Sequence, residues 1–316
     1  MAFRDLETMI RKRILGQDIL INRLLIALLA DGHLLVEGAP GLAKTRAIKV
    51  LSDHVEGDFQ RVQFTPDLLP ADLTGTDVYL PEEGIFRFQP GPLFHNLVLA
   101  DEINRAPAKV QAALLEAMAE HQITVGHETH ALPKLFLVMA TQNPIEQEGT
   151  YPLPEAQQDR FLMHIRVDYP DADHELAILR LAREESLAGE GVVFEQLSQN
   201  EIFAARQEVN KLYMDETVEH YIVQLVMATR RPDSYCQELA SWIRYPASPR
   251  ASLALDRCAR AHAWLQGRDY VSPADVQAIA PEVLRHRIGL SFEAEAGNVD
   301  TDKVIEELLA RVPVAC

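Results

Sequence analysis

Two spacings of hydrophobic residues divide the first half of the chain into helices and strands. Residues 18–30 place apolar side chains at helical spacing, which predicts an amphipathic helix. Residues 107–121 begin with proline and put Val110, Leu114 and Met118 on one stripe, which predicts another helix. Short, mostly apolar runs, typical of strands buried on both faces of a parallel sheet, occur at 33–37, 60–64, 97–100, 135–140 and 161–167. We therefore expect an α/β fold in which helices pack on a parallel sheet.

The second half of the chain follows a different pattern, because the strand signal disappears after Asp168. Helical spacing occurs at 171–188, 199–212, 215–230, 248–265, 273–287 and 301–311. Two of these segments open with Ser-Pro, at Ser248 and Ser272, which is typical of a capping residue followed by proline in the first helical turn. We predict an α/β domain over residues 1–168 and a smaller all-helical domain over residues 169–316.

A segment between two of the predicted strands interrupts the α/β pattern. Residues 65–91 are rich in proline, glycine and aspartate. Two strand-like pieces, 77–80 and 85–88, flank a Glu-Glu-Gly turn within it. This arrangement predicts an inserted hairpin.

Composition and charge narrow the classes of protein. The 316 residues carry a net charge of −17, and the acidity is spread over both halves, which argues against nucleic acid as a partner. Three scattered cysteines, Cys236, Cys258 and Cys316, are too few for a disulfide framework. The longest apolar runs, such as residues 24–30, are far shorter than the ~20 residues that cross a bilayer, and the first 16 residues do not resemble a signal peptide. We expect a cytoplasmic protein without a membrane span.

A loop at residues 38–45 has the composition of a phosphate-binding loop. The sequence Gly-Ala-Pro-Gly-Leu-Ala-Lys-Thr follows a predicted strand and opens a helix at Lys44. Backbone N–H groups at a helix start attract phosphate, Lys44 would reach the β- and γ-phosphates, and the Thr45 hydroxyl would bind Mg²⁺. The alternative is a Gly-Pro turn followed by a chance Lys-Thr pair, since Ala43 stands where such loops usually have glycine.

Polar residues at the ends of two later strands favour the phosphate-loop interpretation. Asp101 and Glu102 directly follow the strand at 97–100, and Asn143 follows the next one. In a phosphate-loop protein, Asp101 can hold the Mg²⁺ shell and Glu102 can polarise an attacking water. Asn143 could orient that water. The alternatives are a solvated acidic turn for the carboxylates and a simple Asn-Pro turn for Asn143.

Taken in order, these motifs resemble the AAA+ ATPases, and most closely the MoxR family within them. The resemblance spans residues 38–251 and rests on GAPGLAKT, QFTPDLLPADLTG, PGPLF, LADEINRAP, LLEAMAE, ATQNP, LPEAQQDRF and SPRA. The family often has alanine before the lysine, so Ala43 fits its pattern. The resemblance implies that residues 65–91 are the helix-2 insert and that residues 121–133 form the presensor-1 hairpin.

The resemblance also assigns roles to single residues. It implies that Asp101 and Glu102 form the Walker B pair and that Asn143 is sensor 1. Arg160 matches the arginine finger that reaches a neighbouring subunit, and Arg250 matches sensor 2. The implied nucleotide-binding residues are Gly16, Gln17, Gly38, Ala39, Pro40, Gly41, Leu42, Ala43, Lys44, Thr45, Arg46 and Asp101, and the implied Mg²⁺ ligands are Thr45 and Asp101.

The function that the resemblance implies is hydrolysis of ATP to ADP by an oligomeric ring, a hexamer by family likeness. Such a ring remodels client proteins, with a partner that bears a von Willebrand factor A domain and in some cases with insertion of a metal cofactor. Two alternatives remain open at this stage. A DNA-acting AAA+ motor is disfavoured by the charge of −17. A small-molecule phosphotransferase shares the phosphate loop but has no use for an arginine finger or for sensor 2.

Overall fold

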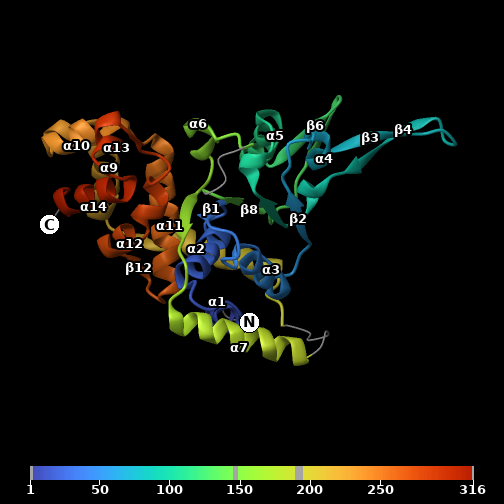
Figure 1. Cartoon of the computed structure of the whole chain (residues 1–316), viewed down its shortest axis with the longest axis horizontal. Helices are drawn as coiled ribbons and strands as arrows, with labels where there is room; N and C mark the ends of the chain where they lie inside the picture. Colours follow the sequence, from blue (N-terminus) through green and yellow to red (C-terminus); the bar gives the residue numbers. More distant parts are fainter. Residues whose placement is uncertain (1–2, 145–148, 189–194, 315–316) are drawn as a thin grey trace. The chain divides into compact units, whose positions relative to one another are not determined.

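The computed structural model describes residues 3–144, 149–188 and 195–314, which form two compact units (Figure 1). The first unit comprises Met1–Leu25, Asp31–Leu153 and Ile165–Ile202, and the second comprises Ile26–Ala30, Pro154–His164 and Phe203–Cys316. Residues 154–164 therefore group with the second unit, although the last two of them, Met163 and His164, begin the last strand of the sheet. Cys316 lies outside the described residues, and neither Cys236 nor Cys258 is in a disulfide within the described part of the chain.

A five-stranded sheet forms the centre of the first unit, with the strand order β2-β5-β8-β1-β9. Its strands are β1 (Leu34–Gly38), β2 (Phe59–Gln63), β5 (Leu97–Asp101), β8 (Leu137–Gln142) and β9 (Met163–Val167). The pairs β2–β5, β5–β8 and β8–β1 are parallel, as the apolar runs predict. The edge strand β2 differs from the central strands, because only Val62 in it is buried. Parallel pairing puts the carboxyl ends of these strands at one edge of the sheet.

The helices of the first unit include both segments predicted from apolar spacing, 18–30 and 107–121, and the helix predicted to open at Lys44. They are α1 (Phe3–Arg13), most of α2 (Asp18–Leu29), α3 (Lys44–His54), α4 (Pro70–Thr74), α5 (Ala108–Glu120) and α7 (Ala172–Ala188). Helix α3 buries Ala47, Ile48, Val50 and Leu51, and packs against β5 and α1. This packing fixes the start of α3, and with it Lys44, next to the sheet.

Two antiparallel hairpins extend from the first unit (Figure 1). The insert at 65–91 contains β3 (Gly75–Leu80) and β4 (Ile85–Pro90), and the segment after α5 contains β6 (Gln122–Val125) and β7 (Glu128–Ala131). At the base of the insert, a Cβ on Gly75 would lie 2.3 Å from the carbonyl oxygen of Gln89, so only glycine fits there. The hairpins contact each other, and the rings of Phe88 and His130 stack with centroids 3.9 Å apart.

Helices dominate the second unit, as the sequence predicts. They are α6 (Glu155–Gln158), most of α8 (Gln199–Lys211), α9 (Glu216–Arg230), α10 (Gln237–Trp242), α11 (Pro249–Leu265), α12 (Pro273–Leu284), α13 (Phe292–Ala296) and α14 (Thr301–Arg311). Two small strand pairs were not predicted: β10 (Tyr213–Met214) with β12 (Tyr270–Val271), and β11 (Ile243–Tyr245) with β13 (Gly289–Leu290). Strands this short contain too few residues to produce an alternating pattern. In the described part of the chain, no helix combines the length and apolar character needed to cross a membrane.

Candidate active site

The loop between β1 and α3 contains two residues with a left-handed backbone conformation. Gly41 has φ of +85° and Ala43 has φ of +57°, and α3 begins at the next residue. Ala43 in this conformation costs roughly 1–2 kcal/mol relative to an ordinary backbone. Gly38 is fixed by a close approach instead, because a Cβ there would lie 2.7 Å from the carbonyl oxygen of Val167. The loop therefore holds a strained shape that leads directly into a helix N-terminus.

Lys44 lies inside this loop. Its Nζ donates to the carbonyl oxygens of Gly38 and Ala39, the latter at 3.2 Å, and to that of Gln142 at 3.5 Å. Burial lowers the pKa of Lys44 from its ordinary value, and the charges of Asp101 and Glu102 oppose that shift. The ammonium group is thus held between the loop and the end of β8, with two carboxylates nearby. Thr45, in the first turn of α3, is half-buried.

Asp101 ends β5 with its carboxylate engaged on both oxygens. Thr141 donates its hydroxyl to Oδ1 at 2.6 Å, and Arg61 donates Nη2 to Oδ2 at 2.6 Å and Nε at 3.1 Å. Asp101 is only 8% exposed, so these charge-assisted bonds hold it in one orientation. The Asp101 carboxylate therefore offers oxygen atoms that could bind a metal ion at the carboxyl edge of the sheet.

Glu102 follows in a left-handed conformation, with φ of +57°. Its backbone N–H donates to Thr141 Oγ1 at 2.9 Å, so one hydroxyl joins both acidic residues. Its Oε2 accepts from Gln63 Nε2 at 2.7 Å and from Arg105 Nη1 at 2.9 Å. The Glu102 carboxylate is therefore held toward β2 and the short 3-10 helix at Ile103–Arg105.

Sequence reasoning missed the residues that hold the acidic pair: Arg61, Gln63, Arg105 and Thr141. The register of the strands places two of them, and the sequence alone does not give that register. Gln63 pairs directly opposite Asp101 across β2 and β5, and Thr141 follows Ala140, which pairs with Ala100. Asn143 follows β8 by one residue and is 5% exposed, so the structure brings it to the same edge of the sheet.

A pocket of about 220 Å³ opens beside the loop within the first unit. Ile14, Leu15 and Gln17 line it from the segment between α1 and α2, and Pro40–Ala43 and Arg46 line it from the loop side. Helix α7 and the residues before it complete the wall. Gln17 donates Nε2 to the carbonyl oxygen of Asp168 at 3.2 Å. Gly16 sits against His174, and it does not line the pocket itself. An apolar chamber next to a phosphate-type loop has the character of a base-binding site.

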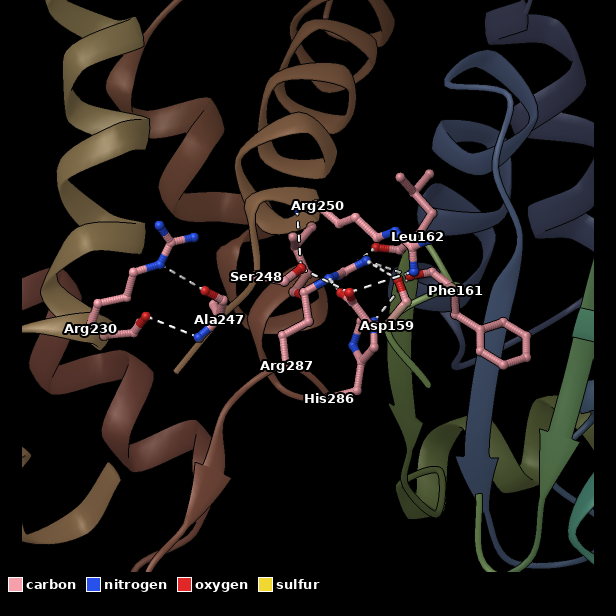
Figure 2. Close-up of polar contacts among 11 residues, drawn as sticks. Asp159, Phe161, Leu162, Arg230, Ala247, Ser248, Arg250, His286 and Arg287 are labelled. Atoms are coloured by element: carbon pink, nitrogen blue, oxygen red, sulfur yellow. Dashed lines mark hydrogen bonds and ion pairs between the residues drawn. The ribbon is translucent and has the colours of Figure 1, made fainter. Parts of the chain in front are cut away.

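Arg160 and Arg250 belong to the second unit, whereas the loop and the two carboxylates belong to the first. Arg160 is half-buried and directly follows Asp159. Arg250 lies in the first turn of α11, and its Nη1 is 3.7 Å from Asp159 Oδ2 (Figure 2). The start of α11 is capped by Ser248, whose Oγ accepts from the Arg250 N–H at 3.2 Å. The structure therefore places the two predicted arginines in one neighbourhood.

Comparison with known proteins identifies the family. The family model described as "ATPase family associated with various cellular activities (AAA)" matches residues 33–163, and an AAA lid domain model matches residues 238–308. The chain is 45% identical to the protein named Chaperone MoxR1 of Mycobacterium tuberculosis over 305 residues, which is 96% of this chain and 80% of that protein. The chain belongs to the MoxR family of AAA+ ATPases.

Two further relatives agree with this membership. The chain is 35% identical to Protein MoxR of Methylorubrum extorquens, over 97% of this chain and 93% of that protein. A crystal structure from Cytophaga hutchinsonii, described as that of an ATPase, shares 47% identity with a TM-score of 0.92, covering 99% of this chain and 95% of that one. The expected fold of a parallel-sheet AAA+ core with a lid domain is confirmed. This MoxR-family chain is an ATPase, and an AAA+ ATPase binds nucleotide.

Proposed function

We propose that this ATPase hydrolyses ATP to ADP and phosphate at the loop of residues 38–45, with the base in the adjacent pocket. The observation that carries the proposal is the convergence of Lys44, Asp101, Glu102 and Thr141 at one edge of the sheet. In this assignment Gln17 lies beside the base, Gly16 shapes the turn before it, and Arg46 lines the same pocket.

The donor set at this edge fits Mg²⁺. A hydroxyl from Thr45 and a carboxylate from Asp101 are hard oxygen donors, the type that Mg²⁺ prefers. The ion, when bound, neutralises charge on the phosphates. Lys44 places a positive charge at the β- and γ-phosphates, Glu102 accepts the proton of the attacking water, and Asn143 orients that water. Glu102 has to turn from Gln63 and Arg105 toward the water before it can act.

We further propose that the active form is a ring, a hexamer by family likeness, in which Arg160 reaches the nucleotide of a neighbouring subunit. In this ring, Arg250 in the helical second unit responds to the γ-phosphate of the bound nucleotide. A cation delivered to the transferring phosphoryl group is worth ~10³ to 10⁵ in rate, so a lone subunit would turn over very slowly.

Mixing two inactive variants tests this proposal. Lys44→Ala subunits lose the cation in the loop but keep Arg160, and Arg160→Ala subunits keep an intact loop but lose the finger. Each variant alone is expected to be inactive. A 1:1 mixture creates sites that combine the loop of one subunit with the finger of the other, so ATP hydrolysis should reappear. If differently tagged subunits co-purify as mixed rings and hydrolysis stays absent, Arg160 does not act in trans.

The ring is proposed to remodel or activate a client protein in the cytoplasm, together with a partner bearing a von Willebrand factor A domain. Insertion of a metal cofactor into the client is one form that this activation would take. A relative named as a chaperone and the net charge of −17 support a protein client over a nucleic acid. Adding a purified von Willebrand factor A protein from the same genome should raise the ATPase rate, and adding duplex DNA should not. Stimulation by DNA alone would favour a DNA-acting motor instead.

A further inference from the structure

Arg287 is a buried arginine in the second unit whose guanidinium is fully used. Its side chain is 2% exposed. Nε donates to Asp159 Oδ1 at 2.8 Å, Nη1 to the carbonyl oxygens of Leu162 and Val283, and Nη2 to those of Phe161 and Asp159. A guanidinium has five N–H donors, so each of them has an acceptor here. Four of the five bonds go to the segment from residue 159 to residue 162, which contains Arg160 (Figure 2).

The residues before Arg287 bind the same stretch of chain. His286 Nε2 donates to the carbonyl oxygen of Phe161 at 3.1 Å, and Arg285 Nη1 donates to that of His164 at 2.7 Å. These three residues directly follow α12, which ends at Leu284. The end of one helix thus supplies donors to backbone carbonyls both next to Arg160 and beyond it.

Asp159 connects this segment to the start of α11. Its Oδ1 accepts from Arg287, and its Oδ2 accepts from the Ser248 hydroxyl at 2.8 Å. The guanidinium of Arg250 faces the same Oδ2 at 3.7 Å. Residues 154–164 and α11 belong to one compact unit, so a rotation of that unit would carry Arg160 and Arg250 together.

We propose that Arg287 is a positioning residue for Arg160, which it holds through the backbone of residues 159–162. The inference rests on the proposed role of Arg160 as an arginine finger. A buried charged pair adds little net stability, because the desolvation of the two charges offsets their attraction. The bonds from Arg287 instead fix the backbone on both sides of Arg160, and this sets the direction in which the Arg160 side chain leaves the chain. A lysine at position 287 would keep the charge but has three donors from a single nitrogen, which cannot span these acceptors.

Subunit mixing separates this role from a general effect on folding. Arg287→Lys is mixed with Lys44→Ala in one experiment and with Arg160→Ala in the other, and ATP hydrolysis is measured in each. In the first mixture Arg287→Lys supplies the nucleotide site, and in the second it supplies the finger. We expect hydrolysis equal to that of the Lys44→Ala and Arg160→Ala pair in the first mixture, and about 100-fold lower hydrolysis in the second.

Arg206→Lys is the matched control. Arg206 is a buried arginine of the same unit that donates Nε to the carbonyl oxygen of Leu28 at 2.9 Å, away from residues 159–162. The Arg206→Lys variant should give equal rates of ATP hydrolysis in the two mixtures. If Arg287→Lys does not assemble, Asp159→Asn replaces it, because this change removes the charge that Arg287 binds. Hydrolysis should then fall more in the mixture where Asp159→Asn supplies the finger than in the mixture where it supplies the nucleotide site.

The outcomes distinguish the inference from the proposed function. Equal activity of Arg287→Lys in the two mixtures, or an equal loss in both, would overturn the positioning role while leaving the finger assignment intact. Failure of the Lys44→Ala and Arg160→Ala pair to recover hydrolysis in mixed rings would overturn the finger assignment and this inference with it.

Discussion

Thr141→Val removes the hydroxyl that joins the two acidic residues while nearly preserving the shape of the side chain. Thr141 is 1% exposed, donates to Asp101 Oδ1 at 2.6 Å and accepts from the Glu102 N–H at 2.9 Å. A hydrogen bond to a charged group contributes about 1.5–3 kcal/mol, and a neutral bond to an amide contributes roughly 1 kcal/mol. The free energy of unfolding should therefore fall by about 2.5–4 kcal/mol.

The same change should slow catalysis, because Asp101 and Glu102 lose a shared anchor. A displacement of about 1 Å at a reacting group costs roughly 100-fold in rate, so we expect kcat to fall by about 10- to 100-fold. The assays are urea unfolding and steady-state phosphate release. Thr124→Val is the matched control, since Thr124 lies exposed on β6 and its hydroxyl is 3.0 Å from that of Thr129. If Thr141→Val unfolds and turns over like Thr124→Val, the hydroxyl does not organise the acidic pair.

The remaining predictions concern stability. Asp275 is buried and accepts from His262, Arg268 and Ser272. Burial would raise its pKa, but these hydrogen bonds outweigh burial and hold the pKa below its ordinary value. Asp275→Asn should lower the free energy of unfolding by about 3–5 kcal/mol at pH 7 in urea titrations. The stability that the ionised Asp275 contributes is fully present above the pKa of about 4 that the group has in the unfolded chain, and it is lost as the pH falls through the lower pKa of the folded protein. The difference in free energy of unfolding between Asp275→Asn and wild type should therefore be smaller at pH 3 than at pH 7. An equal difference at both pH values would refute this account. Ala43→Gly should relieve the left-handed backbone and raise stability by up to about 1 kcal/mol in the same assay, whereas a loss of stability would show that the alanine methyl matters more than the backbone strain.

The sequence was sufficient to predict the central strands and the loop, because both depend on local patterns. Strands β5 and β8 are apolar runs, and Lys44 and Asp101 directly follow β-strand and turn signals. The supporting residues depend on pairing between distant segments. Gln63 reaches Glu102 only because β2 and β5 pair in the observed register, and one sequence does not specify that register.

The hydrogen bonds from Arg287 to residues 159–162 could not be predicted for a related reason. Arg287 binds residues that precede it by more than 120 positions, and its segment was predicted to be the last turn of a helix that in fact ends at Leu284. A basic residue at a helix end is usually solvated, so its burial depends on tertiary packing that spacing does not report. The roles of Arg160 and Arg250 came from family resemblance and stay predictions.

Glu102→Gln gives the most direct test of the central claim that this loop and this carboxylate hydrolyse ATP. Phosphate release is measured with ATP and Mg²⁺, without an added acceptor, alongside binding of a fluorescent ATP analogue. We expect Glu102→Gln to bind the analogue as wild type does and to release phosphate about 10²- to 10⁴-fold more slowly, because an amide cannot accept the proton of the water. Glu82→Gln, an exposed change between β3 and β4, should match wild type in both assays. Release at the wild-type rate by Glu102→Gln would contradict the assignment of the catalytic base.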